Sequence, residues 1–91
     1  MLRVSWTNRG LDDLDLITDY IGDRNFAAAE RIRILIEDAA ERLPNHPYAH
    51  RPGRVPGTRE AEVHPNYIIV YAVGAATITI LAVIHARQQY P

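Results

Sequence analysis

Hydrophobic positions in the first half of the chain recur every three or four residues, as they do along one face of an α-helix. The first such series consists of Leu11, Leu14, Ile17 and Ile21. Thr7 or Asn8 can cap the N-terminus of this helix, and Gly22 can end it in the left-handed conformation. The pattern therefore predicts a helix between these caps and Gly22.

A second helical series begins after a short link. Its apolar positions are Ala28, Ile32, Leu35, Ile36, Ala39 and Leu43. Asn25 is a suitable N-cap, and Pro44 cannot continue the helix. Because the link is short, we expect an antiparallel helical hairpin whose two apolar stripes face one common layer.

Strand patterns occur at the N-terminus and throughout the second half. The predicted strands are Arg3–Trp6, Arg59–His64, Tyr67–Val73 and Thr77–His85, which contain alternating or β-branched apolar residues. Pro65 and Asn66 can form a turn, and Gly74 begins a tight connection. We therefore predict an α+β fold, ordered β-α-α-β-β-β, in which a helical hairpin packs on a small, mainly antiparallel sheet. Residues 1–91 are expected to form a single domain.

The central predicted strand is apolar on both faces. One side carries Ile68, Val70 and Ala72, and the other carries Tyr67, Ile69, Tyr71 and Val73. Two helices cover only one face of a sheet. The second face is therefore expected either to accept a partner, such as an amphipathic helix, or to be covered by the long loop and the C-terminal tail.

Residues 44–58 interrupt the regular patterns. This stretch holds four prolines and two glycines in fifteen residues, so we predict a loop. The loop carries Arg51, Arg54, His46 and His50, which makes it the first candidate working segment. Pro47 separates the two histidines and breaks the helical spacing that a metal site would need, so neither a metal nor another cofactor is predicted.

Composition narrows the classes of function. The chain has no cysteine and a net charge of −1, with a calculated pI near 6.4. Thiolate catalysis and cysteine-containing zinc motifs are excluded, and nucleic-acid binding through the overall field is disfavoured. The N-terminus does not have the pattern of a signal peptide, and the longest apolar run is better suited to a hairpin than to a membrane span. We expect a cytoplasmic protein that does not insert into membranes.

Four segments together resemble the RelE/ParE toxin family. They are Gly53-Arg54, Gly57-Thr58-Arg59-Glu60, the run from His64 to Tyr71 (HPNYIIVY) and the run from Ile80 to Pro91 (ILAVIHARQQYP). Trp6-Thr7, Asp13-Leu14, Tyr20-Ile21 and the alanine-rich second helix add a weaker similarity to ParE-type members. The order and the spacing of the segments both match, so the resemblance covers nearly the whole chain.

The resemblance implies the toxin of a bacterial type II toxin–antitoxin system, a class connected with growth inhibition and plasmid stabilisation. Such a toxin is neutralised by a cognate antitoxin in a hetero-oligomer. RelE-like members cut messenger RNA on the ribosome, whereas ParE-like members poison DNA gyrase. The chain has no lysine, and Tyr67 occupies the place where many nucleases of the family carry an arginine. We therefore favour a ParE-like poison of gyrase. The alternatives are a RelE-like endoribonuclease and an inactive relative that only binds a partner.

The candidate site residues depend on which alternative holds. For a nuclease, Arg54 and Arg59 would hold phosphate, His85 would move a proton, Arg87 would stabilise charge, and Tyr90 would stack or donate a proton. Each also has a structural interpretation; for example, Arg54 can pair with an acidic residue on the following strand. The residues expected to contact a protein partner are Tyr67, Ile69, Tyr71, Arg87 and Tyr90.

Overall fold

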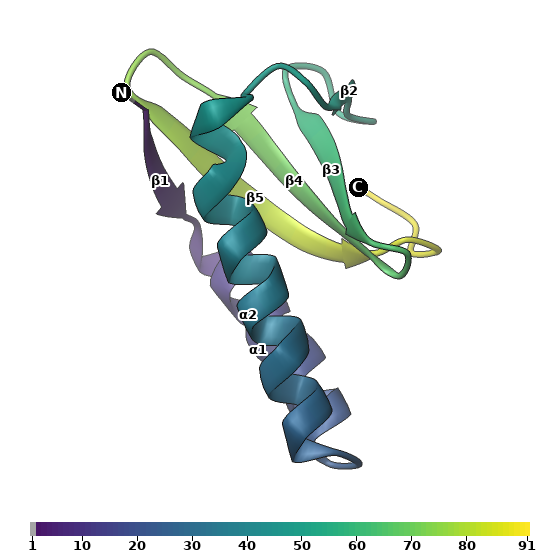
Figure 1. The fold of residues 1–91 in the computed structure, drawn as a ribbon. Helices are drawn as coiled ribbons and strands as arrows, with labels where there is room; N and C mark the ends of the chain where they lie inside the picture. The colour runs from purple at the N-terminus through teal and green to yellow at the C-terminus, as the bar shows by residue number, and fades with distance from the viewer. Residues whose placement is uncertain (1) are drawn as a thin grey trace.

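The computed structural model describes residues 2–91, and it places two helices on one face of a five-stranded sheet (Figure 1). The elements in chain order are β1 (Arg3–Trp6), α1 (Asn8–Gly22), α2 (Phe26–Arg42), a 3-10 turn η1 (Leu43–Asn45), β2 (Arg51–Pro52), β3 (Arg59–His64), β4 (Tyr67–Val73) and β5 (Thr77–His85). The predicted α+β class and the four predicted strands are confirmed. The additional strand, β2, lies within the segment predicted to be a loop.

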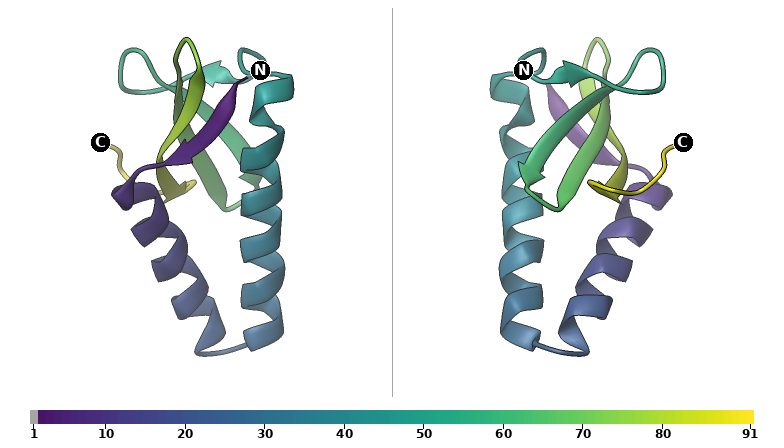
Figure 2. Two further views of the ribbon diagram at one scale, coloured as in Figure 1. Left: turned by 90° about the vertical axis from the view of Figure 1, so that its left-hand side faces the viewer. Right: turned by 90° about the vertical axis from the view of Figure 1, so that its right-hand side faces the viewer.

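Both helices begin at the polar caps that the sequence predicts. The Thr7 hydroxyl accepts a hydrogen bond from the backbone N–H of Gly10 at 3.0 Å, and the Asn25 side chain accepts one from Ala28 at 2.9 Å. Each cap satisfies a backbone donor that has no partner within its helix. The helices then form a hairpin whose far end extends well beyond the sheet (Figure 2).

The strand order in the sheet is β1-β5-β4-β3-β2. Only the β1–β5 pair is parallel, while the other three pairs are antiparallel. β1 ends at Trp6, and beyond this point β5 has no strand on that side. α1 takes over there, because the Thr7 N–H donates to the Ile80 carbonyl at 3.0 Å and the Asp13 carboxylate accepts the Val83 N–H at 3.0 Å.

The main core lies between the helices and the sheet. Its buried members are Leu14, Ile36, Ala40, Leu43, Ala61, Ile69, Tyr71, Ile78, Ile80 and Val83. Two residues of the predicted first helical stripe do not belong to this core: Ile21 is half-buried near the end of α1, and Leu11 is 46% exposed. Leu11 precedes Leu14 by three residues, so it lies at the edge of the stripe, on the side away from Ile17.

The opposite face of the sheet is covered by the chain itself. Its buried residues are Ile68, Val70, Ala82 and Ile84, and the partly buried Leu81, Ala86 and Tyr90 pack against them. Ala86 and Tyr90 belong to the C-terminal tail, which curls back over this face (Figure 1). The second face of the sheet was expected either to accept a partner or to be covered by the loop and the tail, and in the structure the tail covers it.

The predicted loop over residues 44–58 is only partly irregular. Residues 43–45 form η1, and Arg51 and Pro52 form β2, which pairs with Glu60 and Arg59 of β3. The prolines made this segment look irregular, yet proline is compatible with an edge strand because its missing N–H faces away from the sheet. The short pairing fixes the loop against β3.

Candidate functional site

Glu60 is the centre of a charged cluster on the tail-covered face of the sheet. Its carboxylate accepts a hydrogen bond from the backbone N–H of Arg54 at 3.0 Å and from the Arg51 guanidinium at 3.3 Å, and Arg54 Nε lies 3.4 Å away. The Glu60 side chain is 2% exposed, so its charge needs these partners. Arg54 thus holds the loop against β3 as the counterion of a buried carboxylate.

The backbone conformation and packing of the loop explain why glycine occupies positions 53 and 57. A side chain at Gly53 would collide with the Thr58 hydroxyl, and Gly57 has a φ of +84°, a region that disfavours residues with a Cβ atom. The Gly53 N–H donates to the Thr58 carbonyl at 2.7 Å, which closes the loop. The Gly-Thr-Arg-Glu motif is therefore accounted for by the folding of this loop.

Arg59 lies on the other face of the sheet. Its guanidinium donates to the carbonyl oxygens of His50 at 2.8 Å and Tyr48 at 3.2 Å, and it stacks 5.0 Å from the centre of the Tyr48 ring. Beside it, the Tyr71 hydroxyl donates to the Pro47 carbonyl at 2.8 Å. Arg59, through its Nη1 group, and Tyr71 together fix residues 47–50 over the sheet.

An aromatic cluster of His64, Tyr67 and His85 lies at the turn between β3 and β4 and at the end of β5. The Tyr67 ring is 5.5 Å from the His64 ring and 5.7 Å from the His85 ring, between centroids. Nδ1 of His64 accepts the Asn66 N–H, and Nδ1 of His85 accepts the Arg87 N–H. In the neutral state each imidazole therefore carries its proton on Nε2. Burial raises the pKa of the Tyr67 phenol, and the nearby Tyr20 adds to the shift.

His64 was not among the candidates predicted from the sequence. His64 belongs to the motif around Tyr67, and a histidine at a strand end has no chemical signature by itself. Its contact with Tyr67 depends on the Pro65-Asn66 turn, where the pairing register shifts between Glu62 and His64. The turn at Pro65 and Asn66 was predicted, but the pairing register of β3 with β4 was not.

The C-terminal tail is attached through several polar contacts. Arg54 Nη1 donates to the Gln88 carbonyl at 3.0 Å, and the Gln88 side chain accepts the His85 N–H at 3.2 Å. The Arg9 guanidinium lies 5.5 Å from the centre of the Tyr90 ring. Tyr90 is only partly exposed, whereas Arg87 is exposed.

The five residues predicted for RNA cleavage do not form one site within residues 2–91. Arg54 faces the tail, Arg59 faces the loop on the opposite side of the sheet, and His85 lies in a groove beside α1. Arg87 and Tyr90 follow in the tail. The fold connects Arg54 to the tail but holds Arg59 on the opposite face of the sheet.

Two of the residues predicted to contact a partner are core residues. Ile69 and Tyr71 are fully buried under the helices, because residues 67, 69, 71 and 73 point to the helix side of the sheet. Their burial corrects the expectation that they offer contact surface. Tyr67 is half-buried and lines a groove, so it keeps an accessible edge.

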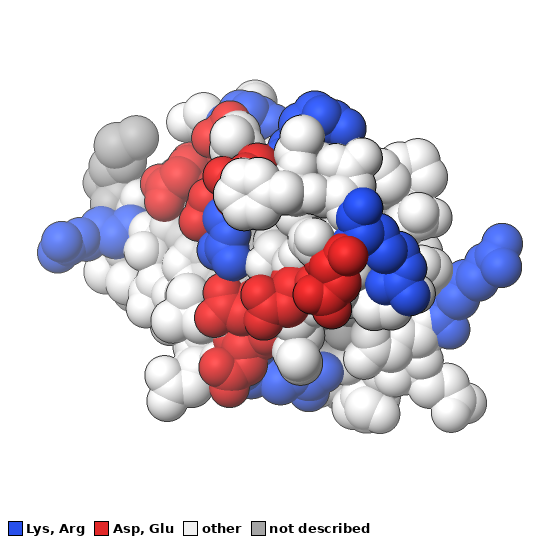
Figure 3. All heavy atoms as spheres, turned by 90° about the horizontal axis from the view of Figure 1, so that it is seen from below, with Lys and Arg blue, Asp and Glu red and all other residues white. Residues whose placement is uncertain are grey.

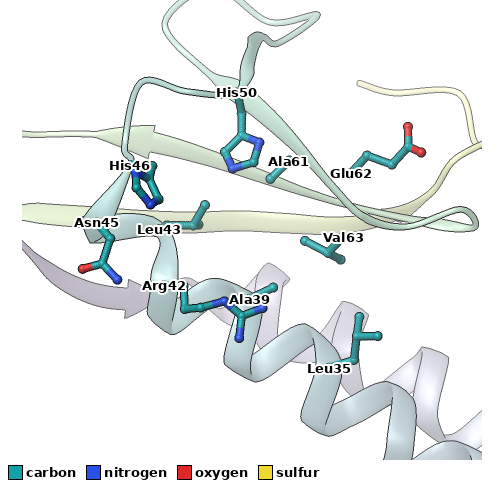
Figure 4. A pocket seen from close by; sticks show the side chains of 10 residues that line it. All are labelled: Leu35, Ala39, Arg42, Leu43, Asn45, His46, His50, Ala61, Glu62 and Val63. Atoms are coloured by element: carbon teal, nitrogen blue, oxygen red, sulfur yellow. The ribbon is translucent and has the colours of Figure 1, made fainter.

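The first of two open grooves lies between α2 and β3, and we call it the α2–β3 groove (Figure 4). It has a volume of about 480 Å³, and its lining consists of Leu35, Ala39, Arg42, Leu43, Asn45, His46, His50, Ala61, Glu62 and Val63. Leu35 and Ala39 on the helix face Val63 on the strand, while the polar residues stand at the rim. β2 pairs only with Arg59 and Glu60, so the rest of β3 borders this groove with an unpaired edge.

The second groove lies on the other flank of the hairpin, and we call it the α1–β5 groove. It has a volume of about 300 Å³ and is lined by Asp13, Leu16, Ile17, Tyr20, Tyr67, Val83, His85 and Gln88. The two grooves share no lining residue. Leu16 is 68% exposed and Tyr20 is 64% exposed, so large apolar surface remains open to solvent here.

Acidic side chains gather over the free end of the hairpin, as Figure 3 shows. Asp19, Asp23 and Glu30 line a hollow between α1 and α2. Among residues 2–91 no group of three or more histidine, aspartate or glutamate side chains is arranged to hold a metal ion. No helix in the same range is long and apolar enough to cross a membrane.

Comparison with known proteins gives a consistent result. Residues 4–90 match the family model described as the ParE toxin of the type II toxin–antitoxin system parDE. The chain is 40% identical to Y4kP of Sinorhizobium fredii, over 98% of this chain and 93% of that protein. It is 37% identical to toxin RelE2 of Caulobacter vibrioides, over 97% of this chain and 99% of that protein. A solved structure of the chromosomal ParDE system from P. aeruginosa matches with a TM-score of 0.84 and 25% identity, covering 93% of this chain and 96% of that one.

Proposed function

Because this chain belongs to the family of ParE toxins of type II toxin–antitoxin systems, we propose that it inhibits growth by binding DNA gyrase, and that a cognate antitoxin neutralises it. The family membership fixes the toxin class. The target is inferred from the residues of this chain, because one fold can carry different activities.

The observation that supports the proposal is that Arg54 and Arg59 make structural contacts within the protein. Arg54 is the counterion of the buried Glu60, and Arg59 is bonded to two backbone carbonyls. A nuclease of this kind needs cationic groups free to stabilise a phosphorane, placed together with a proton-transfer group. Here Arg54 and Arg59 are engaged in the fold and lie on opposite faces of the sheet. Binding to a protein target does not require such an assembly.

We place the antitoxin in the α2–β3 groove. The groove is apolar along its floor, and it borders the unpaired edge of β3, to which an extended segment can add as a further strand. Arg42 at the rim offers a cation to an acidic group of the antitoxin. An antitoxin bound there would contact α2 and the sheet together, which fits a partner that neutralises the toxin by enclosing it.

The target is tested with purified gyrase and relaxed plasmid DNA. We expect the protein to inhibit supercoiling in a concentration-dependent manner, and we expect addition of the antitoxin to restore supercoiling. Supercoiling that is unchanged at a large molar excess of folded toxin over gyrase would remove gyrase as the target.

A second candidate function, ribosome-dependent cleavage of messenger RNA, is favoured by one observation. His85 is exposed, and its ring lies 5.7 Å from the ring of Tyr67, between centroids. Histidine is the residue that most often serves as a general acid or base in such reactions. This candidate requires that a translating extract shows cuts in the ribosomal A site, and that His85→Ala or Arg87→Ala removes them.

A further inference from the structure

A small hollow lies over the end of the sheet at β2, and we call it the Tyr48 hollow. It has a volume of about 300 Å³ and is lined by Tyr48, Pro52, Gly57, Thr58, Arg59 and Val73. A Cβ atom built on Gly57 would have no atom within 4 Å, so the space over the backbone there is open. The hollow therefore presents an aromatic ring, a guanidinium group and accessible backbone to a ligand.

Arg59 is the charged residue of the lining. Its Nη1 donates to the carbonyl oxygens of His50 at 2.8 Å and Tyr48 at 3.2 Å, which holds the guanidinium in place. These bonds use one of the three guanidinium nitrogens, while Nε and Nη2 carry further N–H donors. A guanidinium held in this way is suited to bind the oxygens of a phosphate through two parallel hydrogen bonds.

The segments that build the hollow contain no acidic residue. Residues 42–59 and 63–91 hold neither aspartate nor glutamate. Between these two segments, the Glu60 carboxylate is buried on the opposite face of the sheet, and Glu62 pairs with Arg51 at 3.9 Å. The acidic side chains of the hairpin gather at its free end, whereas β2 lies at the other end of the molecule (Figures 1 and 3). The net charge of the chain is −1, but the surroundings of this hollow favour an anion.

Tyr48 provides a flat apolar surface beside the guanidinium. The Arg59 guanidinium lies 5.0 Å from the centre of the Tyr48 ring, and Tyr48 is 66% exposed. Tyr20 is a useful comparison, because it is 64% exposed and Arg24 lies 4.2 Å from the centre of its ring. Tyr20, however, has the exposed Asp23 one turn farther along α1. The two tyrosines thus offer the same pair of groups in settings of different charge.

We propose that the Tyr48 hollow binds one nucleotide of a single-stranded nucleic acid, with a phosphate on the Arg59 guanidinium and the base stacked on the Tyr48 ring. Sites for single strands combine cationic groups with aromatic side chains on which bases stack. An acidic protein side chain would pair with Arg59 but would leave the Tyr48 ring without a partner, whereas a nucleotide engages both. This binding goes beyond the proposed function, because it requires neither gyrase nor the antitoxin.

Three variants test the hollow. Tyr48→Ala removes the stacking surface, whereas Tyr48→Phe keeps the ring. Tyr20→Ala is the matched control, because it removes an equally exposed tyrosine that is also stacked with an arginine. The bond from Arg59 to position 48 goes to the backbone carbonyl, so all three variants retain it. Thermal unfolding followed by circular dichroism verifies that each variant is folded.

Fluorescence anisotropy with labelled oligothymidylate and oligouridylate of about eight nucleotides measures the affinity at low salt. We expect the wild type and Tyr48→Phe to bind alike, and Tyr48→Ala to bind about tenfold more weakly. Tyr20→Ala should stay within about twofold of the wild type. The affinity should fall as the salt concentration rises, because a phosphate is contacted. Binding of either oligonucleotide supports the proposal, and the ratio of the two affinities shows whether DNA or RNA is preferred.

Three results would overturn the proposal: no binding of the wild type to either oligonucleotide, unchanged binding by Tyr48→Ala, or an equal loss in Tyr20→Ala. A labelled oligoglutamate peptide that binds the wild type while neither oligonucleotide does so would assign the hollow to an acidic protein segment instead. Each of these measurements uses the toxin alone. Failure of the nucleotide site is therefore distinguishable from failure of the toxin to inhibit gyrase.

Discussion

The Asp13 carboxylate accepts a hydrogen bond from the backbone N–H of Val83 at 3.0 Å, and so joins α1 to β5 beyond the last residue of β1. The Asp13 side chain is 15% exposed. Without the Asp13 carboxylate, the Val83 N–H would lie under α1 with no hydrogen-bond partner. A single side chain therefore replaces the strand that is missing at this edge of the sheet.

We predict that Asp13→Ala lowers the free energy of unfolding by about 1–3 kcal/mol, because a largely buried N–H is left without an acceptor. Chemical denaturation followed by circular dichroism measures the loss. Asp13→Asn is the matched control, since its amide oxygen can still accept the hydrogen bond, and it should lose clearly less. Equal stability of Asp13→Ala and the wild type would mean that this hydrogen bond does not stabilise the fold.

Glu60→Ala should lower the free energy of unfolding by about 2–3 kcal/mol, because it removes a buried carboxylate on which two arginines converge. Arg54 also holds Gln88, so the change should loosen the tail, which hydrogen exchange of the tail amides measures. Arg51→Ala serves as the comparison. Arg51 is 51% exposed, and its loss should cost under about 1 kcal/mol. Equal stability of the two variants would show that the buried Glu60 carboxylate does not stabilise the fold.

Stability should fall at alkaline pH because of the phenols of Tyr67, which is half-buried, and Tyr71, which is buried. Burial raises the pKa of both Tyr67 and Tyr71 in the folded state, although the Arg59 charge lowers that of Tyr71 in part. The folded state thus holds the phenolic protons more tightly than the unfolded chain, in which the tyrosine pKa is about 10. Their contribution is complete below that pH and is lost as the pH rises through the folded pKa values.

The urea midpoint between pH 8 and 11 measures this effect. The double variant Tyr67→Phe/Tyr71→Phe should show a shallower alkaline decline than the wild type. It should also be less stable at neutral pH, since the Tyr71 hydroxyl loses its bond to the Pro47 carbonyl. Parallel declines for both proteins would contradict the burial of these phenols.

Leu35→Glu should weaken the binding of the antitoxin by about tenfold or more, because it places a charge in the apolar floor of the α2–β3 groove. The neighbouring Ile34→Glu changes an exposed residue outside that floor, so it is the matched control and should bind normally. Isothermal titration calorimetry with the purified antitoxin gives both affinities. A normal affinity for Leu35→Glu would remove the antitoxin from this groove.

The regular elements could be predicted because their causes are local. Thr7 and Asn25 cap the helices as predicted, and the three strand patterns of the second half became β3, β4 and β5. Helical periodicity and capping act over a few residues, so they are readable in the sequence. The pairing of β1 with β5 was not predicted, because it joins residues more than seventy positions apart.

Whether a residue of the central strand is buried under the helices could not be predicted, because this depends on which face of the sheet the helices cover. Strand alternation separates Tyr67, Ile69 and Tyr71 from Ile68 and Val70, but it does not state which set meets the helices. The sequence therefore left Ile69 and Tyr71 as contact residues, although they form the core.

The candidate site shows the same limit. Motif spacing identified Arg54, Arg59 and Glu60 together, yet adjacent residues of a strand point to opposite faces. Arg54 reaches Glu60 on one face, while Arg59 reaches Tyr48 and His50 on the other. The grooves could not be predicted at all, because each combines a helix with a strand that is distant in the sequence.

The central claim is that this toxin acts by binding gyrase, and its most direct measurement is the amount of linear plasmid that gyrase releases after protein denaturation. If the account is right, linear DNA rises with the concentration of the wild-type toxin, requires gyrase, and falls when the antitoxin is added. The account is contradicted if linear DNA stays at the level of gyrase alone while the same toxin preparation cuts messenger RNA in a translating extract.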